Sequence, residues 1–384
     1  MPKKLLARFE PLRRFKGFNV PWTEDKLFNL VKPYHPTNPH PSDLLTHEQG
    51  YPVFGANGYI GYAQTYNHDL PQVVVCARGN NAGKINLVNA PVWITANALV
   101  LQTETQQQLD KLFLYYHLHN NPLESYVTGG AQPQLTKGSL NNFKLVYPEL
   151  AEQERIGKFL HLLLEHIELT QSKIQVWQEF TQKLRQLIFP QGKQELPSLR
   201  FKEFTQPWQN TTVKQIGQRF NNLRKPVTSH KRVPGTTPYY GSTGISSYID
   251  GYTHDGEYIL IAEDGASDLN NYPVMQTSGK IWVNNHAHVL QAIPEQADND
   301  FLAQALKNVN YKVLVNGSSR FKLTTVVLDN IPLKVPHLDE QRKIGKLLSN
   351  LEQHIKGLEE FLAHLHKQRK ALINELLTVN PIED

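Results

Sequence analysis

The sequence repeats itself once at a spacing of about 188 residues, and this duplication limits its possible folds more than any other feature. Residues 14–22, RFKGFNVPW, recur as RFKEFTQPW at 200–208, with six of nine positions identical. Residues 148–158 recur at 336–346, and both copies read Pro-x-Leu-x-Glu-Gln-x-x-Ile-Gly-Lys. Solenoid repeats run about 20–50 residues, so this longer unit predicts two copies of one domain.

Two further matches keep the same order along the chain. Residues 52–58 match 238–244 at an offset of 186, and residues 93–102 match 282–291 at an offset of 189. Such regular spacing predicts a pseudo-two-fold relation between the copies. Two related but unequal surfaces would suit a target that itself has two halves.

A long amphipathic helix is predicted to follow the Pro-x-Leu-x-Glu-Gln motif in each copy. Apolar residues then alternate at spacings of four and three for about five heptads, which is typical of a coiled coil. We expect the two helices to pack on each other as an antiparallel pair. The alternative is that each helix packs only on its own domain. The predicted seam residues are Ile156, Leu160, Leu163, Ile167, Ile174, Trp177, Leu184, Ile344, Leu348, Leu351, Ile355, Leu358, Leu362, Leu365, Leu372 and Leu376.

The rest of each copy reads as a mixed α/β domain. Short apolar runs such as residues 72–77 and 258–262 are bounded by Gly, Asn and Pro, as strands are. The fold class is therefore predicted to be α+β: two mixed α/β domains separated by two long antiparallel coiled-coil helices. The predicted segments are 1–148 for the first domain, 149–190 for the first helix, 191–336 for the second domain and 337–384 for the second helix.

Composition narrows the class of protein. The 384 residues include a single cysteine, Cys76, which excludes a disulfide framework within the chain and a zinc site built from clustered cysteines. The N-terminal residues lack the apolar stretch of a signal peptide, and no apolar run is long enough to span a membrane. We expect a cytoplasmic protein that does not associate with membranes.

Catalytic patterns are largely missing from the sequence. The glycines of Gly55–Gly61 lack the spacing of a dinucleotide-binding loop, and no phosphate-binding Gly-x-x-x-x-Gly-Lys-Ser/Thr motif occurs. His286 and His288 alternate on a predicted strand, but their counterparts in the first copy are Asn97 and Leu99, so we expect no metal site. We therefore predict a chain without catalytic residues, metal or bound cofactor.

Charge is segregated along the chain. Residues 209–249 and 301–328 contain no acid, whereas residues 250–300 contain nine acids and one lysine. This pattern predicts a basic surface facing nucleic-acid phosphates, with an acidic back formed by residues 250–300. Loops rich in Gly, Asn, Gln, Arg and Lys suit contacts to bases and phosphates, although each could also be an ordinary polar loop. The predicted DNA-binding residues are Arg78, Asn80, Asn81, Lys84, Gln132, Gln134, Lys137, Lys225, Lys231, Arg232, Tyr239, Ser318, Ser319, Arg320 and Lys322.

The doubled helix-entry motif resembles that of the specificity subunit of type I restriction-modification systems. The Pro-Tyr-Tyr-Gly-Ser-Thr-Gly segment at 238–244 and the two Pro-Trp segments ending at Trp22 and Trp208 are similar to that family as well. The resemblance covers essentially the whole chain. It implies two target recognition domains, each reading one half of a bipartite asymmetric site in double-stranded DNA, with helices that set the spacer between the halves.

The same resemblance implies partner proteins. Methyltransferase subunits, which carry S-adenosylmethionine, would dock on the helices, and a separate restriction subunit would cleave DNA. Two other functions stay open at this point. One is a duplicated coiled-coil scaffold that binds proteins without DNA specificity, and the other is a self-contained methyltransferase or nuclease.

Overall fold

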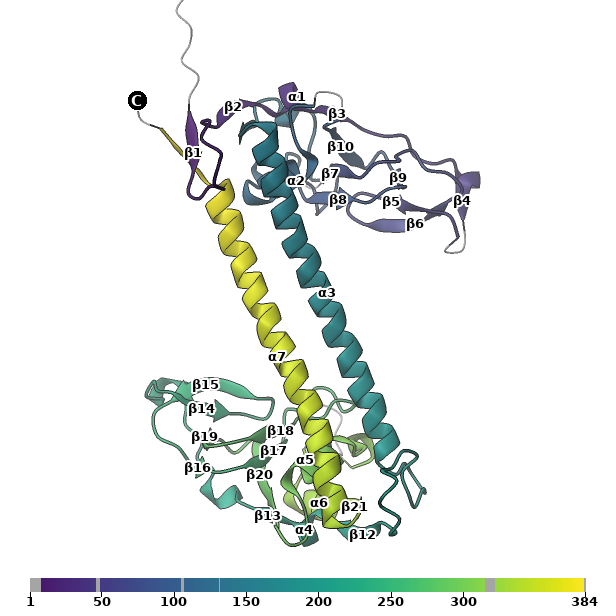
Figure 1. Ribbon diagram of the computed structural model, residues 1–384, viewed down its shortest axis with the longest axis vertical. Helices are drawn as coiled ribbons and strands as arrows, with labels where there is room; N and C mark the ends of the chain where they lie inside the picture. Colours follow the sequence, from purple (N-terminus) through teal and green to yellow (C-terminus); the bar gives the residue numbers. More distant parts are fainter. Residues whose placement is uncertain (1–7, 46–48, 105–106, 131, 315–321, 383–384) are drawn as a thin grey trace, which may run out of the picture. The chain divides into compact units, whose positions relative to one another are not determined.

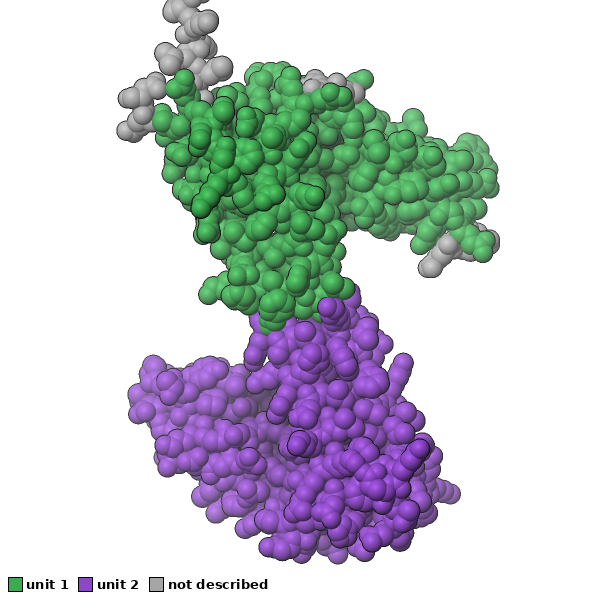
Figure 2. Space-filling view, viewed as in Figure 1, with its two compact units in different colours: residues 1–171, 361–384 green, residues 172–360 purple. Residues whose placement is uncertain are grey.

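The computed structural model describes residues 8–45, 49–104, 107–130, 132–314 and 322–382. The chain forms two compact units (Figure 2). Unit 1 comprises Met1–Gln171 and Phe361–Asp384, and unit 2 comprises Ser172–Glu360. Three predicted DNA-binding residues, Ser318, Ser319 and Arg320, lie outside the described residues.

Unit 1 carries the first copy of the repeat (Figure 1). Its elements in chain order are β1 (Phe9–Pro11), β2 (Thr23–Lys26), α1 (Leu27–Leu30), β3 (Lys32–Tyr34), β4 (Leu44–Leu45), β5 (Tyr51–Phe54), β6 (Tyr59–Ala63), β7 (Gln72–Cys76), β8 (Ile85–Val88), β9 (Trp93–Ile94), β10 (Ala98–Gln102), α2 (Lys111–Asn120), β11 (Lys144–Tyr147) and the first part of α3 (Leu150–Ile188).

Unit 2 carries the second copy. Its elements are β12 (Gln209–Thr212), α4 (Val213–Ile216), β13 (Gly217–Arg219), β14 (Thr237–Tyr240), β15 (Ile245–Ile249), β16 (His254–Asp255), β17 (Tyr258–Ala262), β18 (Val274–Thr277), β19 (Lys280–Val283), β20 (Ala287–Ala292), α5 (Asn299–Lys307), α6 (Thr325–Asp329), β21 (Pro332–Val335) and the first part of α7 (Leu338–Leu377). The last strand, β22 (Val379–Pro381), belongs to unit 1.

The main sheets of the two copies have the same topology, whereas the second sheets differ in their fourth strand: β4 lies beside β6 in unit 1, and β16 lies beside β19 in unit 2. The main sheet runs β3-β10-β7-β8 in unit 1 and β13-β20-β17-β18 in unit 2, with antiparallel neighbours throughout. A second sheet in each unit contains one parallel pair, β5 with β9 and β14 with β19. The predicted mixed α/β class and the internal repeat are confirmed.

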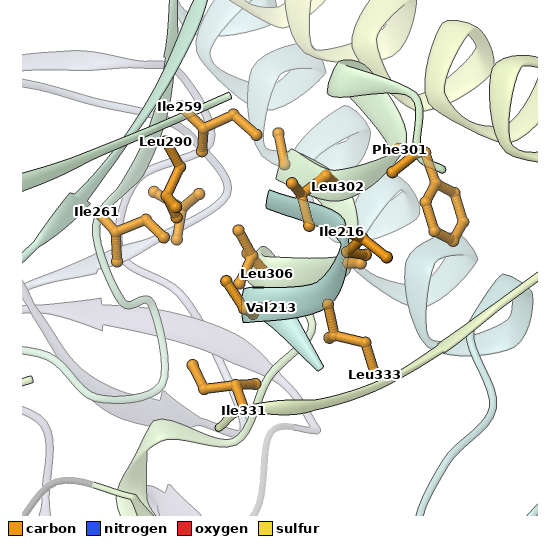
Figure 3. Packing of buried hydrophobic residues seen from close by; sticks show 14 of the residues in the cluster. Val213, Ile216, Ile259, Ile261, Leu290, Phe301, Leu302, Leu306, Ile331 and Leu333 are labelled. Atoms are coloured by element: carbon orange, nitrogen blue, oxygen red, sulfur yellow. The ribbon is translucent and has the colours of Figure 1, made fainter. Parts of the chain in front are cut away.

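Each main sheet is buried on both faces, which explains the apolar runs at its centre. In unit 2, Ile259 and Ile261 of β17 point toward α5, where they pack with Leu302 (Figure 3). Leu260, between them in the chain, faces the second sheet and packs with Val283. Successive side chains of a strand point to opposite faces, so one apolar run supplies two cores.

An ion pair joins each globular part to its long helix. In unit 1 the guanidinium of Arg14 donates two hydrogen bonds, of 2.8 and 2.6 Å, to the carboxylate of Glu152. In unit 2 Arg200 donates two bonds of 2.8 Å to Glu340. Both glutamates are 0% exposed, and a carboxylate is stable at such depth only when it is paired in this way.

The side chain of the glutamine that follows each glutamate bonds to the backbone of two segments, one just before the long helix and one just before the short helix. The amide nitrogen of Gln153 donates to the carbonyls of Pro148 (2.8 Å) and Gln108 (3.1 Å), and its oxygen accepts from the backbone N–H of Asp110 (2.8 Å). Gln341 makes the same three bonds at the equivalent backbone positions of unit 2. The Gln side chain thereby fixes the chain just before α2 or α5.

A glycine in each long helix allows a short helix to approach closely: α2 approaches α3 in unit 1, and α5 approaches α7 in unit 2. A Cβ atom on Gly157 would lie 2.6 Å from Oδ1 of Asp110, and one on Gly345 would lie 2.7 Å from Oδ1 of Asp298. Each aspartate caps its short helix by accepting a backbone N–H three residues later. We call each set of four residues a joint: Arg14, Glu152, Gln153 and Gly157 in unit 1, and Arg200, Glu340, Gln341 and Gly345 in unit 2.

The two predicted long helices are present as α3 and α7, and each unit contains a segment of both. Every predicted seam residue is buried or half-buried. In unit 1 the ring of His166 lies 5.7 Å from that of Phe361. In unit 2 Arg185 of α3 forms a 2.8 Å ion pair with Glu352 of α7.

The prediction that the second helix extends over residues 337–384 is wrong at its C-terminal end. Helix α7 stops at Leu377, and Val379–Pro381 forms a strand paired with Phe9–Pro11. Proline disfavours helical backbone at the preceding residue, here Asn380, so the helix cannot continue through Pro381.

Alanine substitutions in α7 test the close approach at the joint. Gly345→Ala should destabilise the protein by about 2 kcal/mol, because the new methyl group overlaps Asp298 and the backbone of Phe301. Gly357→Ala is the matched control, since a Cβ there meets nothing within 4 Å. That change should stabilise the helix by up to about 1 kcal/mol. Urea unfolding compares the two, and equal effects would contradict the proposed contact.

Candidate nucleic-acid interface

Two of the predicted loops of the first copy meet at the end of the main sheet. Arg78, just beyond β7, forms an isolated antiparallel bridge with Gln134. The N–H of Gly79 donates to the carbonyl of Pro133 (2.9 Å), and that of Leu135 donates to the carbonyl of Ala77 (2.9 Å). Two segments more than fifty residues apart in sequence therefore form one surface.

The candidate side chains on this surface are accessible. Asn81 is half-exposed, and the other predicted residues of the first copy are exposed: Arg78, Asn80, Lys84, Gln132, Gln134 and Lys137. Gly79 and Gly83 have φ angles of +83° and +89°, a left-handed conformation that favours glycine. The loop between β7 and β8 thus turns tightly and presents its polar side chains outward.

The predicted residues of the second copy fall into two groups. Lys225 and Lys231 line a hollow of about 450 Å³, together with Val227, Asp250 and Trp282. Lys322 does not line this hollow, and its backbone forms an isolated β-bridge with that of Asp264.

Tyr239 does not belong among the surface contacts. Its side chain is only 1% exposed, and its hydroxyl lies 3.0 Å from the backbone nitrogen of Val227. Its ring lies 4.0 Å from the guanidinium carbon of Arg232, which also bonds Ser247. Tyr239 therefore supports Arg232 from beneath, and the prediction that it contacts DNA is wrong because the residue is buried.

The second copy has a counterpart of the Arg78 loop that the charge pattern did not identify. The N–H of Leu323 donates to the carbonyl of Glu263 (2.7 Å), as that of Leu135 does to the carbonyl of Ala77. The backbones of Asp264 and Lys322 form an isolated β-bridge, as those of Arg78 and Gln134 do. The prediction that residues 250–300 form an acidic back is therefore wrong for Glu263 and Asp264. The repeat offset of 186 at residues 52–58 was the available signal, because the same offset places Asp264 opposite Arg78.

Glu263 is held by three basic groups. Its carboxylate lies 2.7 Å from Arg224, 3.5 Å from Lys322 and 3.7 Å from the buried ring of His288. Burial alone raises the pKa of Glu263, but the hydrogen bond from Arg224 and the neighbouring basic groups hold the pKa below its ordinary value. Burial lowers the pKa of His288, whose ring also bonds the carbonyl of Leu323.

Asp264 has a different environment. One carboxylate oxygen lies 2.8 Å from Nδ1 of His286, and the side chains of Asp264 and His286 are 25% and 45% exposed. Its neighbour Gly265 has a φ of +74°, matching Gly79 of the first copy. Both side chains are partly exposed, at 25% for Asp264 and 18% for Glu263, but only the Glu263 carboxylate is paired with an arginine.

No group of three or more His, Cys, Asp or Glu side chains in the described part of the chain is placed to hold a metal ion. None of the described helices is both long enough and apolar enough to cross a membrane.

Comparison with known proteins identifies relatives of the same kind. The family model for the type I restriction modification DNA specificity domain matches twice, over residues 23–177 and 205–370. A Haemophilus influenzae protein, named as a type I restriction enzyme specificity subunit, is 44% identical over 137 residues. That alignment spans 36% of this chain and only 35% of the relative.

Two other relatives match over most of the chain. A type I restriction enzyme specificity subunit of Methanocaldococcus jannaschii is 23% identical over 327 residues, or 78% of this chain and 76% of that one. The crystal structure of a type I restriction-modification S subunit from M. genitalium superimposes with a TM-score of 0.76 at 18% identity, covering 96% of this chain and 99% of that one. The fold is therefore shared at low sequence identity.

Substitutions at the adjacent acids distinguish their roles. Glu263→Ala should destabilise the protein by about 2 kcal/mol, because it leaves the largely buried Arg224 without its partner. Asp264→Asn should change stability by less than about 1 kcal/mol, since the contact between Asp264 and His286 is partly exposed and such contacts contribute little. Urea unfolding measures both, and a larger loss for Asp264→Asn would reverse the assignment.

Proposed function

The chain belongs to the family of type I restriction-modification DNA specificity subunits, and we propose that it is the DNA-recognition subunit of such a system. Each target recognition domain would read one half of a bipartite asymmetric site. The observation that carries this proposal is that the joint and the main-sheet topology are the same in the two copies, whereas their exposed loops differ. Two readers on a common scaffold suit two unlike half-sites.

The exposed loops have the chemistry that base reading needs. Arginine and lysine donate to guanine, asparagine and glutamine form paired bonds with adenine, and basic side chains also bind phosphates. In the first domain, Arg78 and Gln134 meet on one surface, with Asn80 and Lys84 nearby in the chain. In the second domain, the exposed Lys225, Lys231 and Lys322 provide positive charge.

The long helices would set the spacing between the half-sites. We propose that α3 and α7 form an antiparallel coiled coil, in support of which every heptad position of the predicted seam is buried or half-buried. A coiled coil keeps its length, so it would hold the two readers at a set separation on double-stranded DNA.

A second apolar stripe on α3 suits a protein partner. Leu162 and Leu169, both in unit 1, are seven residues apart and are 54% and 55% exposed. They point away from the seam, because at about 100° per residue they fall on another face of the helix. Exposed apolar stripes of this kind are typical of protein interfaces.

We propose that this stripe binds the methyltransferase subunits of the system. These subunits would carry S-adenosylmethionine and the methylation chemistry, and a restriction subunit would cleave DNA. The chain itself would hold no cofactor and carry out no catalysis. Because its target is cellular DNA, it would work in the cytoplasm.

Selection from random double-stranded DNA, using the chain assembled with its methyltransferase subunit, tests the recognition function. The bound fraction should be enriched in two specified half-sites separated by an unspecified spacer. Absence of any enriched bipartite motif would instead favour a scaffold that binds proteins.

Lengthening the helices tests their role in spacing. One heptad inserted after Gln171 and one after Glu360 keeps the seam in register and adds about 10 Å of helix. DNA rises about 3.4 Å per base pair, so the spacer should lengthen by about three base pairs while both half-sites stay unchanged. Altered half-sites with an unchanged spacer would exclude this role.

A leucine substitution tests the docking stripe. Leu169→Glu places a charge in the stripe and should weaken binding of the methyltransferase subunit by about tenfold or more. Leu196→Glu is a matched control, because Leu196 is an exposed leucine (44%) that lies outside the helices. Isothermal titration of the two variants gives the comparison, and equal affinities would rule out the stripe as the docking site.

A further inference from the structure

Arg78 and Asp264 occupy the same backbone position in the two copies. Each follows the central strand of its own main sheet. The two sheets have the same register at this point, where Cys76 pairs with Ala98 in unit 1 and Ala262 pairs with Ala287 in unit 2. Each bridges the same returning segment, through Gln134 in one copy and Lys322 in the other. A glycine with a left-handed φ follows both. The two recognition domains therefore present opposite charges at one structurally equivalent point.

The carboxylate of Asp264 is available to a ligand. Its Oδ1 is held at 2.8 Å by the ring of His286, while Oδ2 has no hydrogen-bond partner among the described residues. The neighbouring Glu263 already pairs with Arg224 and approaches Lys322. Asp264 is thus a partly exposed acid at this edge of the sheet, and its second oxygen has no partner within the described part of the chain.

The chemistry of DNA limits what such a carboxylate can contact. A phosphate repels it, and guanine presents only acceptors in the major groove. The exocyclic amino group of cytosine or adenine donates there, and aspartate is a known acceptor of this bond from cytosine. At the equivalent position of the first copy, the guanidinium of Arg78 suits the two acceptors of guanine.

We propose that Asp264 determines specificity in the second recognition domain by accepting a hydrogen bond from an exocyclic amino group of a base in the major groove. His286 is a positioning residue that orients the carboxylate. Arg78 reads guanine from the corresponding point of the first domain. This inference rests on the proposed DNA-recognition function and adds to it which kind of base edge each domain meets at this point.

The test is selection from random double-stranded DNA by the full chain assembled with its methyltransferase subunit. In one half-site, the wild type should prefer an amino-bearing base at one position. Asp264→Asn should reduce that preference by about tenfold at that position only, and Asp264→Glu should retain it in part. Asp255→Asn removes the same charge from an exposed residue of β16 in this domain and should leave both half-sites unchanged. Arg78→Gln should alter a guanine in the other half-site.

Several outcomes separate the two levels of the proposal. If the wild type selects no bipartite motif, the recognition function itself fails. If the wild type selects one and Asp264→Asn selects the same one, the assignment of Asp264 fails alone. Tighter binding of Asp264→Asn to all sequences without a change in preference also overturns it, because the aspartate would then only repel phosphates. A loss spread over both half-sites overturns it too, since a base-reading residue acts at one position.

Discussion

The buried ion pair between an arginine of the globular part and a glutamate in the first turn of the long helix is the contact on which each unit depends. Glu152 and Glu340 are buried, and their carboxylates are paired with the guanidinium groups of Arg14 and Arg200. Both pairs are bidentate, which restricts the angle as well as the distance between the two parts. The neighbouring glutamines and glycines then bring the short helix against the long one.

Around this common joint the two copies have diverged. In unit 2 the polar contact between α5 and the long helices is ionic, with Glu352 bonded to both Arg185 and Lys307. In unit 1 α2 instead offers Tyr116, whose hydroxyl lies 3.4 Å from His161. The end of the main sheet shows the same combination of a shared backbone and different side chains, since one copy has Arg78 where the other has Asp264. A duplicated frame can thus carry two different specificities.

The parts that the sequence predicted are those that depend on local pattern. Heptad spacing identified seam residues such as Ile167 and Leu348, and the repeated motifs contain the joint residues, although their contacts were not predicted. Sheet order was not predictable, because β10 enters between β3 and β7 only through pairing of residues far apart in sequence. Charge counted along the chain failed at Asp264 for a related reason. The fold returns residue 322 to this acid, so basic and acidic segments share one surface.

We propose that each recognition domain reads its own half-site, and that one domain can replace the other because both are joined to the long helices in the same way. A chain in which residues 199–336 also replace residues 13–148 would keep both joints, because the exchanged parts begin and end at equivalent positions of the repeat. Methylome sequencing of a host that carries this chain with its methyltransferase partner measures the result. We expect methylation at an inverted repeat of a single half-site, with the spacer close to that of the wild type. Methylation at the original asymmetric site would contradict it.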